Sequence, residues 1–222
     1  MQPLEAFRRS LQRPDIVDWI RSGLIGDNVV IDGPFGPKQM IYADYVASGR
    51  ALDQVEDFIR NSVLPFYANS HTQASYCGSF ITQLREAART EIARLTGADS
   101  DTSVVFTGSG STAAINRLVG LLDIQSAVSR GERAVVLIGP YEHHSNLLPW
   151  RESGAEVIEI KEGPQGGPDM AALSKALDQA TGADVIVGAF SAASNVTGII
   201  SDVDTVTELL KSHDAIAIWD YG

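Results

Sequence analysis

A short loop of glycine and hydroxyl residues, Gly108-Ser109-Gly110-Ser111-Thr112, lies between an apolar run and a helical pattern. Glycine lets the backbone approach a ligand closely, and the start of a helix offers free N–H groups at the positive end of its dipole. This combination favours a phosphate site. The alternative is a capped helix after a flexible turn, with Ser111 as the N-cap. The loop is not a P-loop, because no Gly-Lys-Ser/Thr follows.

The same loop matches the Gly-x-Gly-x-x-Ala pattern of dinucleotide-binding folds. That interpretation requires an acidic residue at the end of the next strand, where it would bind the ribose hydroxyls. The next apolar run ends Ile138-Gly139-Pro140, and Glu142 is only a loose substitute for the missing acid. A dinucleotide-dependent oxidoreductase therefore stays an alternative for the function.

Two adjacent histidines, His143 and His144, follow the same apolar run. Imidazoles at a strand end can bind a metal, transfer protons or stack on a flat ring. No third ligand stands at a spacing typical of metal sites, so no metal site is predicted. The alternative is a pair of ordinary loop histidines.

Two more polar residues, Asn195 and Asp220, follow the last apolar runs. The Asn195 amide could donate to a ligand oxygen or simply form a turn. The Asp220 carboxylate could hold the charge of a protonated ring nitrogen and so make that ring an electron sink, and its alternative is a turn or N-cap aspartate. The hydrolase signatures Gly-x-Ser-x-Gly and His-Glu-x-x-His do not occur.

Hydrophobic periodicity predicts the elements that position these residues. Helices are predicted at 51–63, 80–95 (with Ser79 as N-cap and Gly97 as its end), 115–122, 169–180 and 202–211, and strands at 104–107, 134–138, 156–160, 185–190 and 215–219. Continuous apolar strands that alternate with helices are buried on both faces, so we expect a three-layer α/β fold with a mainly parallel sheet. Ligands bind such sheets at the carboxyl ends of the strands, where the candidate residues lie.

Residues 1–40 show no regular pattern, and the turn-rich segment 33–37 predicts a boundary between an arm (1–40) and a main domain (41–222). The net charge of −11 argues against nucleic acid or an anionic membrane as a partner. No apolar run reaches membrane-spanning length, and residues 1–13 mix charges with single apolar residues, so we expect neither a transmembrane helix nor a secretory signal. A single cysteine, Cys77, excludes an internal disulfide and fits a cytoplasmic location.

Taken in order, the motifs resemble the class V aminotransferase family of pyridoxal-phosphate enzymes, with cysteine desulfurases as the most similar pattern. The resemblance runs from Tyr42 to Asp220, and Ala68-Asn69-Ser70-His71 and Arg89 also fall where that family has similar residues. The segments that carry it are the phosphate loop, Glu142-His143-His144-x-Asn146, Ser194-Asn195-Val196-x-Gly198 and the strand-end Asp220.

This resemblance implies pyridoxal 5′-phosphate as the cofactor and a role for each matched residue. It implies that the cofactor phosphate is held by Gly110, Ser111 and Thr112. It implies that His143 stacks on the pyridine ring and assists proton transfer, and that Asp220 pairs with the ring nitrogen. By the same resemblance, Asn195 lies near the phenolic oxygen, and Ala47 and His71 lie on the substrate side.

The chain also departs from the family pattern at its end. The family continues from its aspartate as Gly-Ala-Gln, whereas this chain reads Tyr221-Gly222, and the family's Schiff-base lysine and sulfur-accepting cysteine come later still. None of the lysines stands in a matching Ser-x-His-Lys context, and Cys77 is expected to be a structural or incidental thiol. We therefore expect a fold-type-I large domain that is incomplete at its C-terminus, with exposed strand edges and apolar helix faces.

The resemblance implies the N-terminal part of an enzyme that acts on an amino acid through aldimine chemistry, inactive as this piece, from a parent that forms a homodimer. A non-catalytic remnant or binding module of the same fold is the alternative, and the dinucleotide-dependent oxidoreductase is a third hypothesis. Desulfurase, lyase and aminotransferase activities share these motifs, so the reaction itself stays open.

Overall fold

A computed structural model describes residues 3–222 and divides into two compact units, with the division between Val105 and Phe106. Met1 and Gln2, at the start of the predicted arm, lie outside the described residues. The predicted boundary at residue 40 stays a prediction. In the part of the chain that the structure describes, no helix combines the length and the apolar character that crossing a membrane requires.

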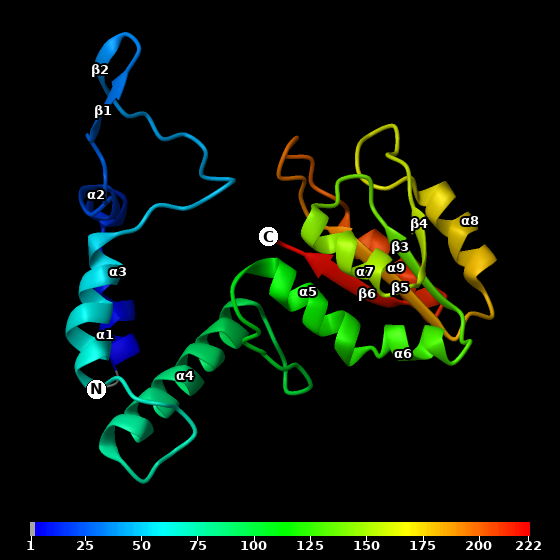
Figure 1. The fold of residues 1–222 in the computed structure, drawn as a ribbon, viewed down its shortest axis with the longest axis horizontal. Helices are drawn as coiled ribbons and strands as arrows, with labels where there is room; N and C mark the ends of the chain where they lie inside the picture. The colour runs from blue at the N-terminus through cyan, green and yellow to red at the C-terminus, as the bar shows by residue number, and fades with distance from the viewer. Residues whose placement is uncertain (1–2) are drawn as a thin grey trace. The chain divides into compact units, whose positions relative to one another are not determined.

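The unit from Phe106 to Gly222 is built on a parallel sheet with the strand order β4-β3-β5-β6 (Figure 1). Its strands are β3 (Ala134–Ile138), β4 (Glu156–Glu159), β5 (Val185–Ser191) and β6 (Ile216–Asp220). The register pairs Ile138 with Ala189 and Ser191 with Asp220, so the carboxyl ends of β3, β5 and β6 lie along one edge. The predicted parallel sheet is confirmed.

Helices cover both faces of this sheet, which gives the predicted three layers (Figure 1). One face is covered by α5 (Gly110–Leu121), α6 (Ile124–Ser129) and α7 (Leu148–Glu152), the other by α8 (Met170–Ala180) and α9 (Val203–Ser212). Side chains of a strand alternate between faces, so Val136 packs with Ile115 and Trp150, whereas Leu137 packs with Leu177 on the opposite face.

The unit that ends at Val105 is mainly helical. Its elements are α1 (Pro3–Ser10), α2 (Ile16–Ser22), the antiparallel pair β1 (Val30–Gly33) and β2 (Gly36–Gln39), α3 (Asp53–Phe58) with the short turns η1 (Ile59–Val63) and η2 (Leu64–Phe66), and α4 (Tyr76–Leu95). The rings of Phe7 in α1 and Phe58 in α3 pack with their centroids 4.9 Å apart. No hydrophobic side chain in the described residues of this unit is fully buried.

Three sequence-based expectations are wrong. Residues 1–40 are not irregular, since two short helices and the β1–β2 hairpin lie there, and the turn-rich segment 33–37 forms the hairpin turn. The run 104–107 is not a strand, because a strand requires a hydrogen-bonded neighbour and no described strand pairs with it. Ser75, rather than Ser79, caps α4, and its side chain accepts the Gly78 N–H.

Candidate functional site

The start of α5 lies in the predicted phosphate loop. Ser109, rather than Ser111, occupies the N-cap position, and its side chain makes no capping hydrogen bond. The N–H groups in the first turn of a helix have no acceptor within the helix, so here they are open to an anion. Gly110 has a φ of 74°, a left-handed conformation that favours glycine, and a Cβ at this position would meet nothing within 4 Å. The loop therefore leaves both room and donors for a small anion.

A chain of hydrogen bonds leads from this helix start to the predicted ring-stacking histidine. Ser111 Oγ donates to Ser145 Oγ over 3.3 Å, and Ser145 Oγ lies 2.9 Å from His143 Nδ1. The Ser145 backbone N–H also donates to His143 Nδ1 over 3.2 Å. Ser145 is buried, whereas the His143 ring is exposed and free to face a ligand. The structure thus brings Ser111 and His143 together, as the sequence motifs predict.

Asp220 lies next to the same helix start. The residue is 8% exposed, and its Oδ1 accepts the Gly222 N–H over 2.9 Å. A Cβ built on Gly222 would lie 2.9 Å from Asp220 Oδ1 and 3.2 Å from Ser111 Oγ, so residue 222 lies between these two side chains. Asp220, Ser111 and His143 therefore share one edge of the sheet.

Glu142 fastens the histidine segment to the sheet. Its Oε1 accepts the Ser191 N–H and its Oε2 accepts the Ser191 hydroxyl, both over 2.8 Å, while the Asn146 amide also donates to Oε2. A Cβ on Gly139 would lie 2.7 Å from Glu142 Oε1, so only glycine lets the carboxylate fold back onto the strand end. Burial raises the pKa of Glu142, although its hydrogen bonds oppose this effect.

The sequence analysis considered Glu142 only as a substitute for the acidic residue that binds ribose hydroxyls, and it did not predict that Glu142 holds the histidine segment against the sheet. Glu142, Asn146 and Trp150 follow one another at a spacing of four residues, and the Trp150 indole N–H donates to Asn146 Oδ1 over 3.1 Å. That spacing was the available signal, because residues four apart face each other in helical turns. The network continues from Ser191, beside Asp220 in the sheet register, to the buried Trp150.

Asn195 lies in a turn after β5. The Ser194 hydroxyl accepts the Val196 and Thr197 N–H groups, and the Ser194 carbonyl accepts the Gly198 N–H over 2.9 Å. The Asn195 side chain is exposed and, across residues 3–222, hydrogen bonds to none of the other candidate residues. The structure brings Ser111, His143 and Asp220 together, and the place of Asn195 near a ring oxygen stays a prediction.

Ala47 and His71 belong to the unit that ends at Val105. Ala47 is exposed, and its N–H donates to the Asp44 carbonyl. His71 has a φ of 71°, and its Nε2 lies 3.0 Å from Nη1 of Arg85 on α4. Their predicted position on the substrate side stays a prediction.

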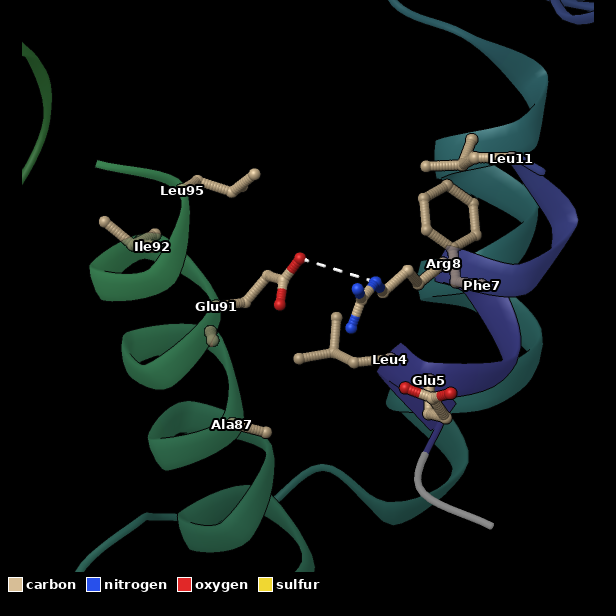
Figure 2. Close-up of a pocket in the computed structure, with 10 residues that line it drawn as sticks. Leu4, Glu5, Phe7, Arg8, Leu11, Ala87, Glu91, Ile92 and Leu95 are labelled. Carbon is tan, nitrogen blue, oxygen red and sulfur yellow. Dashed lines mark ion pairs between the residues drawn. The ribbon is translucent and has the colours of Figure 1, made fainter. Parts of the chain in front are cut away.

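An apolar hollow of about 690 Å³ lies elsewhere, between α1 and α4 (Figure 2). Leu4, Phe7 and Leu11 face Ile92 and Leu95 across it, and one ion pair of 3.7 Å joins Arg8 to Glu91. None of the residues predicted to bind the cofactor or the substrate lines this hollow.

The chain is similar in sequence to a known protein family and to several cysteine desulfurases. The model of a family described as Aminotransferase class-V matches residues 41–221. A probable cysteine desulfurase of Halalkalibacterium halodurans is 27% identical over 199 residues, which are 86% of this chain and 46% of that protein. Another, from Pyrococcus abyssi, is 28% identical over 187 residues, 82% of this chain and 44% of that protein.

Solved structures agree on the fold. The apo structure of a cysteine desulfurase from Thermococcus onnurineus matches with a TM-score of 0.72 at 24% identity, covering 91% of this chain and 46% of that one. The chain thus spans about half the length of the relatives that it matches. Because the identity is low, the structural match supports the α/β fold alone.

Proposed function

Because the chain belongs to the aminotransferase class-V family, which uses pyridoxal 5′-phosphate, we propose that residues 106–222 hold the phosphate and ring of that cofactor. The whole protein would then act on an amino acid, as the names of its cysteine desulfurase relatives suggest. One observation carries the proposal: Ser111, His143 and Asp220, which are far apart in sequence, adjoin at the carboxyl edge of the sheet.

The residues present fit the cofactor by charge and by donor type. The open first turn of α5, with its backbone N–H groups and the Thr112 hydroxyl, suits a phosphate dianion because every group there can donate a hydrogen bond. The buried Asp220 carboxylate suits a protonated pyridine nitrogen, since a charge pair at a site shielded from water is weakly screened. When bound, pyridoxal phosphate supplies an electron sink for the α-carbon of an amino acid.

Each residue has a separate task in this proposal. The Ser111 backbone N–H, the Thr112 hydroxyl and the other N–H groups at the start of α5 bind and orient the phosphate. Asp220 holds a proton on the ring nitrogen. The exposed His143 imidazole covers a face of the ring, and its Nε2 is free to move a proton, since Nδ1 is occupied by Ser145. Glu142 positions the segment that carries His143.

A titration of the 222-residue chain with pyridoxal 5′-phosphate, followed by cofactor absorbance, tests the proposal. We expect Asp220→Asn to weaken binding by roughly 10- to 100-fold, the equivalent of losing about 1.5–3 kcal/mol for a hydrogen bond to a charged group. Asp214→Asn is the matched control, because Asp214 is an exposed aspartate just before the opposite end of β6. Equal affinities for the wild-type chain and both variants would refute the role of Asp220.

A binding module that holds the cofactor without a covalent bond is a second candidate. The lysines of the second unit, Lys161, Lys175 and Lys211, are exposed, and in the described residues none contacts Ser111, His143 or Asp220. Borohydride reduction of the loaded chain followed by mass spectrometry tests whether any lysine of residues 1–222 binds the cofactor covalently. Full release of the cofactor is the result expected of a non-covalent module, whereas a reduced adduct on a single lysine would contradict it.

A further inference from the structure

The hydrogen-bond chain Ser111–Ser145–His143 has a defined direction. A backbone N–H can only donate, so the contact of 3.2 Å from the Ser145 N–H makes His143 Nδ1 an acceptor. A neutral imidazole with an acceptor at Nδ1 carries its proton on Nε2. The Ser145 hydroxyl, 2.9 Å from the same nitrogen, must then donate to it as well.

The Ser145 hydroxyl is held in that orientation from the other side. Ser111 Oγ lies 3.3 Å away and donates to Ser145 Oγ, so the Ser145 proton is left to point at the imidazole. Ser145 is 5% exposed, and water has little access to replace either contact. Ser111 stands in the first turn of α5 and Ser145 in η3 (His144–Asn146), so the chain joins two separate elements.

From this geometry we propose that Ser145 is a positioning residue that selects the Nε2–H tautomer of His143, with Ser111 orienting its hydroxyl. The proposal rests on the proposed function, since the tautomer matters only if His143 faces a cofactor. With Nδ1 occupied by two donors, the Nε2–H group is the one that the exposed ring presents outward. Ser145 acts through His143, with which it makes both contacts.

The test is ¹⁵N NMR of the chain labelled in its histidine rings, measured at about pH 8, above the ordinary histidine range. The sequence has 4 histidines, so a His143→Gln variant assigns the signal. In the wild-type chain we expect Nδ1 to resonate as an unprotonated nitrogen and Nε2 as a protonated one. Ser145→Ala removes the hydroxyl and should convert His143 to a mixture of tautomers.

Two further variants keep the result interpretable. Ser153→Ala is the matched control, because Ser153 is also 5% exposed but donates to the Trp150 carbonyl instead, and it should leave the His143 signals unchanged. Ser111→Ala should produce a smaller shift in the same direction as Ser145→Ala, and its position in the first helical turn makes it tolerant of alanine. Circular dichroism and tryptophan fluorescence verify that each variant is folded.

A wild-type nitrogen pattern that persists in Ser145→Ala and in Ser111→Ala would overturn the proposal. Titration with inorganic phosphate, followed on the amide signals of Gly110–Thr112, separates this failure from failure of the phosphate site. If phosphate leaves those amides unshifted, the proposed phosphate site is wrong, and the tautomer comparison still decides the role of Ser145.

Discussion

Helices α8 and α4 both carry apolar side chains, but only α8 lies on a sheet within its own unit. Leu173 and Leu177 of α8 are fully buried against β3, whereas Leu95 of α4 is 67% exposed. The same contrast holds for the units: every buried hydrophobic side chain in residues 3–222 lies at Ile115 or later. The unit from Phe106 to Gly222 therefore has its own hydrophobic core, and the unit that ends at Val105 has not.

This difference shows that a helical pattern and a stable core are separate properties. The period of apolar residues is enough to define a helix, but burial requires a second apolar surface at the right distance. The candidate site depends on the well-packed unit, because Ser111, His143 and Asp220 are attached to strands and helices with buried side chains. Strands and helices that are packed in a core restrict the motion of the site side chains that they carry.

The largest expected effect comes from core truncation. Leu177→Ala should lower the free energy of unfolding by about 2–5 kcal/mol, because it leaves a cavity against β3. Leu95→Ala, the matched change in α4, should cost less than about 0.5 kcal/mol. Urea unfolding monitored by circular dichroism measures both. Similar losses for the two variants would contradict the contrast between the units.

Replacement of Glu142 should have the next largest effect, and it should depend on pH. Glu142→Ala removes the acceptor of the Ser191 and Asn146 donors and should cost about 1–3 kcal/mol. Because the folded-state pKa of Glu142 is raised, the folded chain binds this proton more tightly than the unfolded chain. The stabilisation that this proton gives to the folded chain is therefore fully present below the pKa of Glu142 in the unfolded chain. It is lost as pH rises through the pKa of Glu142 in the folded chain.

Glu142→Gln isolates that pH dependence, because glutamine does not titrate. As pH rises from the ordinary glutamate range through the raised folded-state pKa, the wild-type chain should lose stability relative to Glu142→Gln. Thermal unfolding across this pH range is the measurement, with Glu152→Gln on the exposed side of α7 as the control for net charge. If the unfolding temperatures of the wild type and Glu142→Gln changed with pH in parallel, the pKa of the Glu142 carboxyl would not be raised in the folded chain.

Helix caps should have intermediate effects in both units. Ser75→Ala at α4 and Asp169→Ala at α8 each remove acceptors from first-turn N–H groups and should cost about 1 kcal/mol. Amide hydrogen exchange locates each effect, and Ser75→Ala should speed exchange in α4 alone. Ser79→Ala should be milder, since Ser79 accepts a hydrogen bond from the Gln83 side chain over 2.9 Å and caps no N–H group of α4. A larger effect at Ser79 would favour the cap predicted from the sequence.

The smallest effect is expected at the ion pair beside the hollow of Figure 2. Arg8 and Glu91 are 3.7 Å apart, and both side chains are partly exposed, so solvent and salt screen their attraction. Arg8→Ala should leave the unfolding midpoint unchanged within error. A clear loss that disappears at high salt would show that this pair stabilises the unit that ends at Val105.

The sequence alone determined the type and order of the four strands and of helices α5, α8 and α9 in the well-packed unit, but it did not predict α6 or α7. Strands 134–138 and 185–190 and helices 169–180 and 202–211 match the structure closely, because period and capping residues are local properties. It also indicated that the polar residues follow the strands at their carboxyl ends. The predicted strand at 104–107 failed because strand pairing depends on residues distant in sequence.

Only the tertiary structure decided how the site is held together. The contacts of Glu142 with Ser191 and of Ser111 with Ser145 join segments 49 and 34 residues apart, and they exist because the parallel register brings the strand ends to one edge. Spacing along the chain carries no information about such contacts. Residue types could therefore suggest the chemistry, but the register of the sheet and the path of its loops determined which side chains meet.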